Sequence, residues 1–170
     1  MSEKYGRVEK YYITDEDIVT IKYRNFSRKP DDFNPDGPKY SNFWVVLTEQ
    51  KADELREEGF NIRERENQDG DIEFRLQVFI SGKDEWFPKI IKKCNGRKTV
   101  LDRESMATLD RDELERVDLA VTKGRWEFNG RSGIQAWLNI GEFEIVYDAF
   151  GSMDDDYDED DEPTDDLPFK

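Results

Sequence analysis

Short alternating segments joined by glycine turns constrain the fold of this chain more than any other feature. Between residues 72 and 80, apolar and polar side chains alternate, the period of a β-strand with one buried face. Asn95-Gly96 and Asn129-Gly130 follow other segments rich in β-branched and aromatic residues, and this dipeptide favours the two-residue turn of a β-hairpin. The chain is therefore expected to be built mainly of hairpins.

Only two segments have the pattern of a helix. Thr48 can cap a helix over residues 49–58 that ends at Gly59, and Asp102 can cap a short helical stretch as far as Asp110. The expected strands cover residues 19–24, 42–47, 60–65, 72–80, 89–94, 98–101, 117–122, 125–128 and 133–147. Many short strands with one or two short helices predict a mainly β fold, a small β-barrel or sandwich.

The negative charge is concentrated at the C-terminal end. The chain has a net charge of −15, and residues 152–170 hold ten acidic residues and one lysine, which leaves −6 for residues 1–151. A run of like charges repels itself and has too few apolar side chains to offset the entropy of ordering. We expect a folded domain over residues 1–151 and a disordered acidic tail with an apolar tip over residues 152–170.

Several classes of protein are disfavoured by composition. The chain has no histidine and one cysteine, Cys94, which excludes serine–histidine and cysteine–histidine catalysis and zinc sites that need imidazole. A lone cysteine fits a reducing compartment. Residues 1–17 are charged, and the longest notable apolar run is 43–47, so we expect no membrane segment and a cytoplasmic location. We expect no enzyme, no cofactor and no metal.

Cations and aromatic rings gather in the same three segments of an otherwise acidic body. Single-stranded nucleic acid requires this combination, because cations follow the phosphates and exposed rings stack on bases. For each cluster the alternative is that the rings are core and the cations only a solvated face. Phe43, Trp44 and Phe74 lie in patterned strands and are expected in the core. The candidate binding residues are Lys22, Tyr23, Arg24, Phe26, Arg28, Lys29, Trp86, Lys89, Lys92, Lys93, Arg97, Lys98, Lys123, Arg125, Trp126, Arg131 and Trp137.

The acidic tail has two expected roles. A polyanion tethered to a basic groove competes with nucleic acid at high effective concentration, so it should weaken non-specific contacts until a strand displaces it. Its tip, Leu167-Pro168-Phe169, is apolar and stiffened by proline, which suits a small pocket on a partner protein.

The tip and the body each resemble a known family. Residues 165–169 (Asp165, Asp166, Leu167, Pro168, Phe169) resemble the acidic tip of bacterial single-stranded-DNA-binding proteins, although Lys170 follows the phenylalanine that is terminal in that family. The body resembles bacteriophage single-stranded-DNA-binding proteins with an OB fold. The matching stretches are 21–27 (IKYRNFS), 42–43 (NF), 59–62 (GFNI), 98–102 (KTVLD), 117–119 (VDL), 126–130 (WEFNG) and 133–138 (GIQAWL).

The phage resemblance spans most of residues 18–150 and implies an OB-fold-like small β-barrel. It further implies sequence-independent coating of single-stranded DNA in phage replication, recombination and repair, inside the cytoplasm of an infected bacterium. The tail would regulate access of DNA and contact a polymerase or helicase. The resemblance favours DNA over RNA and a homodimer, and it supplies no catalytic residues.

Two other functions remain open from the sequence. An acidic mimic of DNA that inhibits a DNA-binding enzyme would explain the net charge of −15, but the densest charge lies in the tail and not on the folded body. A metal-dependent nuclease would need carboxylates gathered around a cation, and no set of acidic residues is singled out by its spacing.

Overall fold

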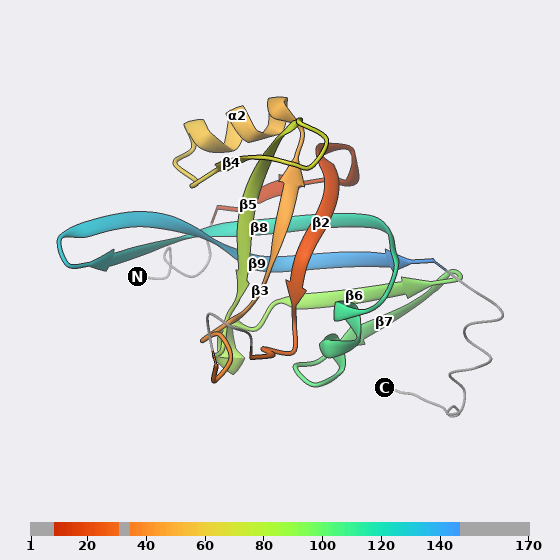
Figure 1. Ribbon diagram of the computed structural model, residues 1–170. Helices are drawn as coiled ribbons and strands as arrows, with labels where there is room; N and C mark the ends of the chain where they lie inside the picture. The colour runs from red at the N-terminus through yellow and green to blue at the C-terminus, as the bar shows by residue number, and fades with distance from the viewer. Residues whose placement is uncertain (1–8, 31–34, 147–170) are drawn as a thin grey trace.

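The structure is a computed structural model that describes residues 9–30 and 35–146 (Figure 1). It contains one α-helix, α2 (Glu49–Glu57), and three short 3-10 helices, η1 (Asp15–Asp17), η2 (Asp84–Trp86) and η3 (Ser105–Asp110). The strands are β1 (Tyr11–Ile13), β2 (Ile18–Asn25), β3 (Ser41–Leu47), β4 (Arg63–Glu66), β5 (Ile72–Ile80), β6 (Lys89–Cys94), β7 (Arg97–Leu101), β8 (Leu114–Phe128) and β9 (Arg131–Ile145). The expected mainly β fold is confirmed.

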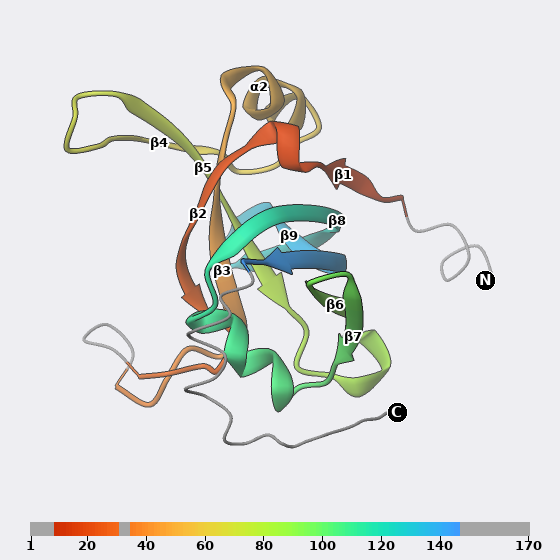
Figure 2. The same cartoon turned by 90° about the vertical axis from the view of Figure 1, so that its right-hand side faces the viewer.

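The strands form one curled sheet with the order β1-β8-β9-β5-β3-β2 (Figure 2). β4 extends the sheet beside β5, and the β6–β7 hairpin joins it beside β9. β9 runs parallel to β5 and β6, whereas the remaining pairs are antiparallel. Within the described residues the two ends of the path, β1 and β2, are joined only through η1. The sheet is therefore open, and the expected barrel is not closed by hydrogen bonds.

The turns that the sequence predicted have the backbone that they require. Asn95 and Gly96 have φ values of 53° and 81°, and Asn129 and Gly130 have 53° and 77°. Positive φ at both central residues is the requirement of the type I′ turn that matches the twist of a hairpin. Both dipeptides therefore end their strands as expected.

The ends of α2 also agree with the sequence. The Thr48 hydroxyl accepts a hydrogen bond from the backbone N–H of Lys51 at 3.3 Å, and Gly59 follows the helix with a φ of +102°. The backbone N–H of Phe60 donates to the Leu55 carbonyl at 3.0 Å. Residues 60–62 therefore complete the helix end, so β4 begins only at Arg63 and not at the predicted residue 60.

The second helix and the strands β1 and β8 also differ from the prediction. The second helix is a 3-10 helix that starts at Ser105, after the Asp102 carboxylate accepts its backbone N–H at 2.8 Å. β8 is continuous where two strands were expected, because Gly124 keeps its pairing with Gln135. The short strand β1 was not predicted.

The predicted acidic tail and its tip lie outside the described residues. No helix among residues 9–30 and 35–146 is long and apolar enough to span a membrane.

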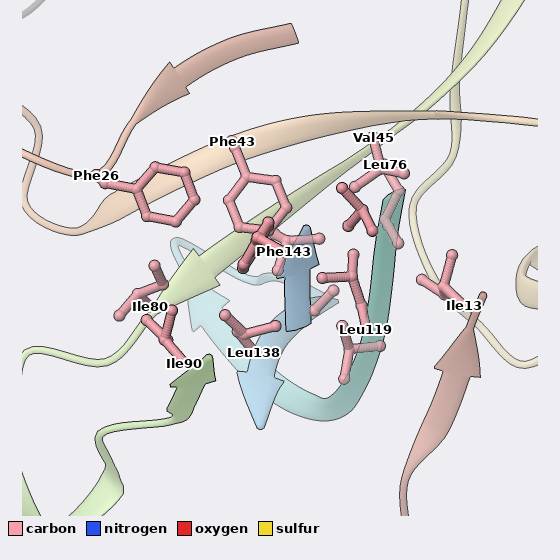
Figure 3. Packing of buried hydrophobic residues seen from close by; sticks show 14 of the residues in the cluster. Ile13, Phe26, Phe43, Val45, Leu76, Ile80, Ile90, Leu119, Leu138 and Phe143 are labelled. Carbon is pink, nitrogen blue, oxygen red and sulfur yellow. The ribbon is translucent and has the colours of Figure 1, made fainter. Parts of the chain in front are cut away.

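The core lies inside the curl of the sheet (Figure 3). The rings of Phe26 and Phe43 stack with centroids 5.2 Å apart, and Phe143 meets Phe26 edge-on at 5.7 Å. The alternate side chains Leu76 and Val78 of β5 also point into this cluster. Phe26 is 1% exposed, so its prediction as a base-stacking ring is wrong. It comes after β2, where the chain turns inward over the core.

Replacing Phe26 by alanine is expected to lower the free energy of unfolding by about 3–5 kcal/mol, because it removes a buried ring from a packed cluster. Urea unfolding followed by circular dichroism measures this change. Tyr23→Ala is the matched control, since Tyr23 is 60% exposed and its loss should cost far less. Equal stability of the Phe26→Ala protein and the parent would show that Phe26 is not in the core.

Candidate nucleic-acid interface

One outer surface of the sheet carries a continuous group of aromatic side chains, which we call the aromatic face. In β3 and β5 the residues that alternate with the core point outward, so Trp44 pairs with Gln77 across the strands. The next strand continues the row, because Phe79 of β5 pairs with Trp137 of β9. The aromatic face consists of Tyr40, Trp44, Gln77, Phe79, Trp126 and Trp137.

The rings at the centre of the aromatic face hold one another in place. Tyr40 meets Trp137 edge-on, with centroids 5.0 Å apart and planes at 85°, and Phe79 lies 5.7 Å from Trp137. All three side chains are only partly buried. Edge-to-face contacts of this kind stabilise a pair beyond its buried area, so the rings are fixed while their remaining surface stays open.

Two glycines of the β8–β9 hairpin give the indoles room to lie against the backbone. A Cβ atom at Gly124 would overlap the indole of Trp137, and one at Gly133 would lie 2.7 Å from the indole nitrogen of Trp126. Gly133 is also the direct partner of Trp126 in the ladder. Each ring therefore covers a glycine of the opposite strand, which is a site where only glycine fits.

Cations border the aromatic face. The Arg63 guanidinium lies 5.4 Å from the ring centre of Trp44, and the Lys39 ammonium lies at the same distance from that of Tyr40. Arg63 and Lys39 have no carboxylate partner at ion-pair distance within residues 9–30 and 35–146. Their charges are therefore available to an anionic ligand beside the rings.

Three adjoining hollows follow the aromatic face. The largest has a volume of about 690 Å³ and contains Trp86, Trp137 and Tyr40. A second, of about 290 Å³, shares Tyr40 with the first and reaches Tyr23, and a third, of about 190 Å³, reaches Trp126. Because the second and third share Trp44, Gln77 and Phe79, the hollows form one path across the sheet.

The structure brings part of the predicted binding set to this path. Tyr23 and Trp86 are 60% and 51% exposed and line the second and first hollows. Lys123 and Trp137 line the first, and Trp126 lines the third. Arg125 and Arg131 are exposed at the tip of the β8–β9 hairpin, which extends past the rest of the sheet (Figure 1). Arg28 and Lys29 are exposed in the loop after β2.

Other predicted cations are engaged in the fold. Arg24 does not reach the aromatic face, because its guanidinium donates to the carbonyls of Leu109 and Asp112 and ties β2 to η3. The Lys92 ammonium lies 2.7 Å from the Asp112 carboxylate. Lys98 pairs with Glu142 at 3.3 Å.

The β6–β7 hairpin carries a separate basic group. It runs beside the C-terminal half of β9, whereas the tip of the β8–β9 hairpin lies at the opposite end of that strand (Figure 1). The predicted binding set is therefore not gathered in one place, because part of it lines the hollows and part lies on the β6–β7 hairpin. The residues of this separate group are Lys89, Lys92, Lys93, Arg97 and Lys98.

Comparison with known families decides what kind of protein carries this surface. A family model described as a putative phage single-stranded-DNA-binding domain matches residues 1–167. The chain belongs to this family. No curated protein matches its sequence.

Comparison with solved structures finds similarity to phage single-stranded-DNA-binding proteins at low sequence identity. The protein from bacteriophage Enc34 in complex with single-stranded DNA is 12% identical, with a TM-score of 0.49, and the match covers 79% of this chain and 87% of that one. Another structure of the Enc34 protein is 11% identical, with a TM-score of 0.48, and the match covers 84% of this chain and 88% of that one. The single-stranded-DNA-binding protein gp2.5 of bacteriophage T7 is 12% identical, with a TM-score of 0.38, and the match covers 95% of this chain and 100% of that one.

The sequence prediction missed three of the five rings of the aromatic face of this phage single-stranded-DNA-binding domain. Tyr40 and Phe79 were not among the candidates, and Trp44 was expected in the core. Trp44 is half-buried on the outer side of β3, between the buried residues Phe43 and Val45. Alternation over residues 41–45 of β3 and 76–80 of β5 places Trp44 and Phe79 opposite the core side chains, so period two was the signal that could have found them.

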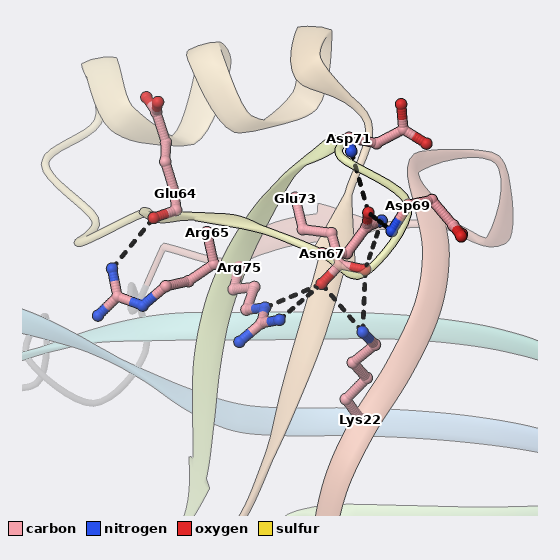
Figure 4. A network of polar contacts seen from close by, with 8 residues as sticks. All are labelled: Lys22, Glu64, Arg65, Asn67, Asp69, Asp71, Glu73 and Arg75. Atoms are coloured by element: carbon pink, nitrogen blue, oxygen red, sulfur yellow. Dashed lines mark hydrogen bonds and ion pairs between the residues drawn. The ribbon is translucent and has the colours of Figure 1, made fainter.

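Lys22 of this phage single-stranded-DNA-binding domain belongs to a polar network at the β4–β5 hairpin (Figure 4). Its ammonium donates to both carboxylate oxygens of Glu73, at 3.0 and 2.9 Å, and Arg75 donates to the same carboxylate at 2.8 Å. Hydrogen bonds from Lys22 and then Arg75 lower the pKa of Glu73 from 4.5 to about 2. Lys22 therefore has a structural partner, although it also pairs with Trp44 across β2 and β3.

This network makes stability depend on pH. Because the pKa of Glu73 is lower in the folded state, its contribution is complete above pH 4.5 and is lost as the pH falls toward 2. Glu73→Gln should therefore be less stable than the parent protein at pH 7, and the difference should shrink below pH 4.5. Urea unfolding at several pH values measures it.

Glu64→Gln is the control, because the Glu64 side chain is 54% exposed and that of Glu73 only 11%. If the difference in the free energy of unfolding between Glu73→Gln and the parent protein stayed constant from pH 7 to pH 3, the lowered pKa of Glu73 would be contradicted.

Among the described residues, no group of three or more cysteine, aspartate or glutamate side chains is placed to hold a metal ion.

Proposed function

We propose that this chain binds single-stranded DNA along the aromatic face, without sequence preference, during phage DNA replication, recombination and repair. The proposal is of a binding protein and not of an enzyme. The observation that carries it is the continuous path of fixed, partly exposed rings bordered by cations that have no carboxylate partner among the described residues. Rings bind the face of any base, and the cations meet the phosphates between them.

The polar groups of the aromatic face support binding without sequence preference. The Gln77 amide donates to the Asn42 side-chain oxygen at 3.1 Å, and the Asn42 amide donates to the Tyr40 carbonyl at 3.0 Å. Side-chain amides can read base edges, and these two at the centre of the path are already engaged with each other and with the backbone. Stacking is left as the main contact with the bases.

Trp126→Ala is expected to weaken binding of oligothymidine about 5- to 150-fold, which corresponds to one lost stacking contact. Its affinity should keep the same dependence on salt, because no charge is removed. Arg63→Gln should instead reduce the slope of log K against log salt by about 0.7, which corresponds to one phosphate contact on a single strand. Fluorescence titration at four salt concentrations measures both effects.

The chain offers matched controls for these variants. Tyr12 is 60% exposed and lies on β1, away from the three hollows, so Tyr12→Ala should leave binding unchanged. Lys98→Gln removes a cation already paired with Glu142 and should leave the slope nearly unchanged. If Tyr12→Ala and Lys98→Gln reduced binding as much as Trp126→Ala and Arg63→Gln, the aromatic face would not be the binding surface.

We propose that the acidic tail, residues 152–170, regulates this binding. The nine net negative charges of the tail compete with DNA for the same cations, and tethering keeps their local concentration high. A chain that ends at Gly151 should bind oligothymidine more tightly than the full chain, and the difference should shrink as salt rises. If the shortened chain bound no DNA, the acidic DNA-mimic hypothesis would replace the present one.

The tip, residues 165–169, is proposed to recruit a replication or recombination protein such as a polymerase or helicase. An apolar Leu167-Pro168-Phe169 segment preceded by Asp165 and Asp166 suits a small apolar pocket rimmed by cations. We further propose a homodimer in the cytoplasm of the infected host. Sedimentation of the full chain over a range of concentrations tests the homodimer.

A further inference from the structure

We propose that the largest of the three hollows along the aromatic face, of about 690 Å³ between η2, β8 and β9, is a nucleotide pocket that binds a single nucleoside monophosphate and anchors one end of the strand. This inference rests on the proposed function and deepens it. It predicts that one nucleotide contributes far more to binding than its neighbours, and that a free mononucleotide binds at the same place.

The size and the walls of the pocket suit a base with its sugar and phosphate. Its volume of about 690 Å³ is more than twice that of the next hollow and lies in the usual range for small-molecule sites. Three rings contribute to its walls, and hydroxyl and amide groups supply hydrogen bonds beside them. The lining residues are Lys10, Tyr40, Ser81, Gly82, Lys83, Trp86, Thr122, Lys123, Trp137, Leu138 and Asn139.

The charge of the lining indicates an anionic ligand. Three lysines and no aspartate or glutamate line the pocket, although acidic residues outnumber basic ones by 41 to 26 in the chain. Lys123 already lies 3.5 Å from the Glu58 carboxylate. Lys10 and Lys83 are exposed and have no carboxylate at ion-pair distance within the part of the chain that the structure describes, so they carry the charge that is open to a ligand. A ligand with an aromatic ring and a phosphate satisfies both the rings and the lysines.

The two tryptophans of the pocket come from separate and well-supported segments. Trp137 is held edge-on by Tyr40 at 5.0 Å and lies against Gly124. Trp86 is on η2, where 51% of its surface is exposed. A ring exposed to this extent beside a fixed one offers a second stacking surface for the same base.

Arg103 supports the segment that carries Trp86. Its guanidinium donates to the Ser81 carbonyl at 3.1 Å and to the Asp84 carboxylate at 3.0 Å. The same group lies 4.7 Å from the ring centre of Phe87. Arg103 therefore contacts the chain both before and after Trp86, and we assign it as a positioning residue for this wall of the pocket.

The test uses the full chain and thymidine monophosphate as the probe. The four tryptophans each give one indole N–H signal in a nitrogen-15 NMR spectrum, and single Trp→Phe variants assign them. Titration should shift the signals of Trp86 and Trp137, while that of Trp126, at the far end of the path, should stay within error. Thymidine without phosphate should bind at least about five-fold more weakly, because the lysine contacts are lost.

Three variants and a control make the result specific. Trp86→Ala and Lys83→Gln should each weaken binding of the monophosphate at least about five-fold. Trp126→Ala is the control and should leave it unchanged while it still weakens oligothymidine. Arg103→Gln should weaken the monophosphate and broaden the Trp86 signal. Circular dichroism and thermal midpoints confirm that each variant is folded.

Failure of the pocket and failure of the proposed function give different results. If oligothymidine binds but the monophosphate shifts no tryptophan signal, or shifts all four alike, the nucleotide pocket is wrong and strand binding stands. If the monophosphate shifts Trp86 and Trp137 but oligothymidine does not bind, the pocket stands and the strand-binding function is wrong.

Discussion

The register of β3, β5 and β9 is the constraint on which the rest of this structure depends. Trp44 pairs with Gln77, and Phe79 pairs with Trp137, so these side chains share the outer surface of the curled sheet. Because side chains alternate across a strand, a slip of one residue would turn them inward and expose the core. The same register that buries Leu76 and Val78 therefore assembles the aromatic face.

Electrostatics then divides the cations of the chain into two kinds. In a protein with a net charge of −15, a cation that has a carboxylate neighbour contributes little to binding an anion. Lys22 and Lys92 are held by Glu73 and Asp112, whereas Arg63 lies over a ring of the aromatic face without an acidic partner among the described residues. The location of unpaired charge, and not the total charge, is what favours the aromatic face as the proposed DNA-binding surface.

The sequence predicted the fold well and the interface only in part, for reasons visible in particular residues. Asn129-Gly130 and the alternation of residues 72–80 are local signals, and both elements were found where expected. The role of Phe26 depends on a chain that folds back over Phe43 and Phe143, which no local pattern records. Arg24 is likewise engaged by carbonyls 85 and 88 residues away.

Photocrosslinking of an oligothymidine that carries 5-iodouracil, followed by mass spectrometry of the peptides, tests the central claim most directly. The position of the strand on the sheet is read without altering any residue. The account predicts crosslinks to Trp44, Phe79 and Trp137 of the aromatic face. Crosslinks confined to the β6–β7 hairpin, residues 89–101, would contradict it, because they would place the strand on the other basic group of the molecule.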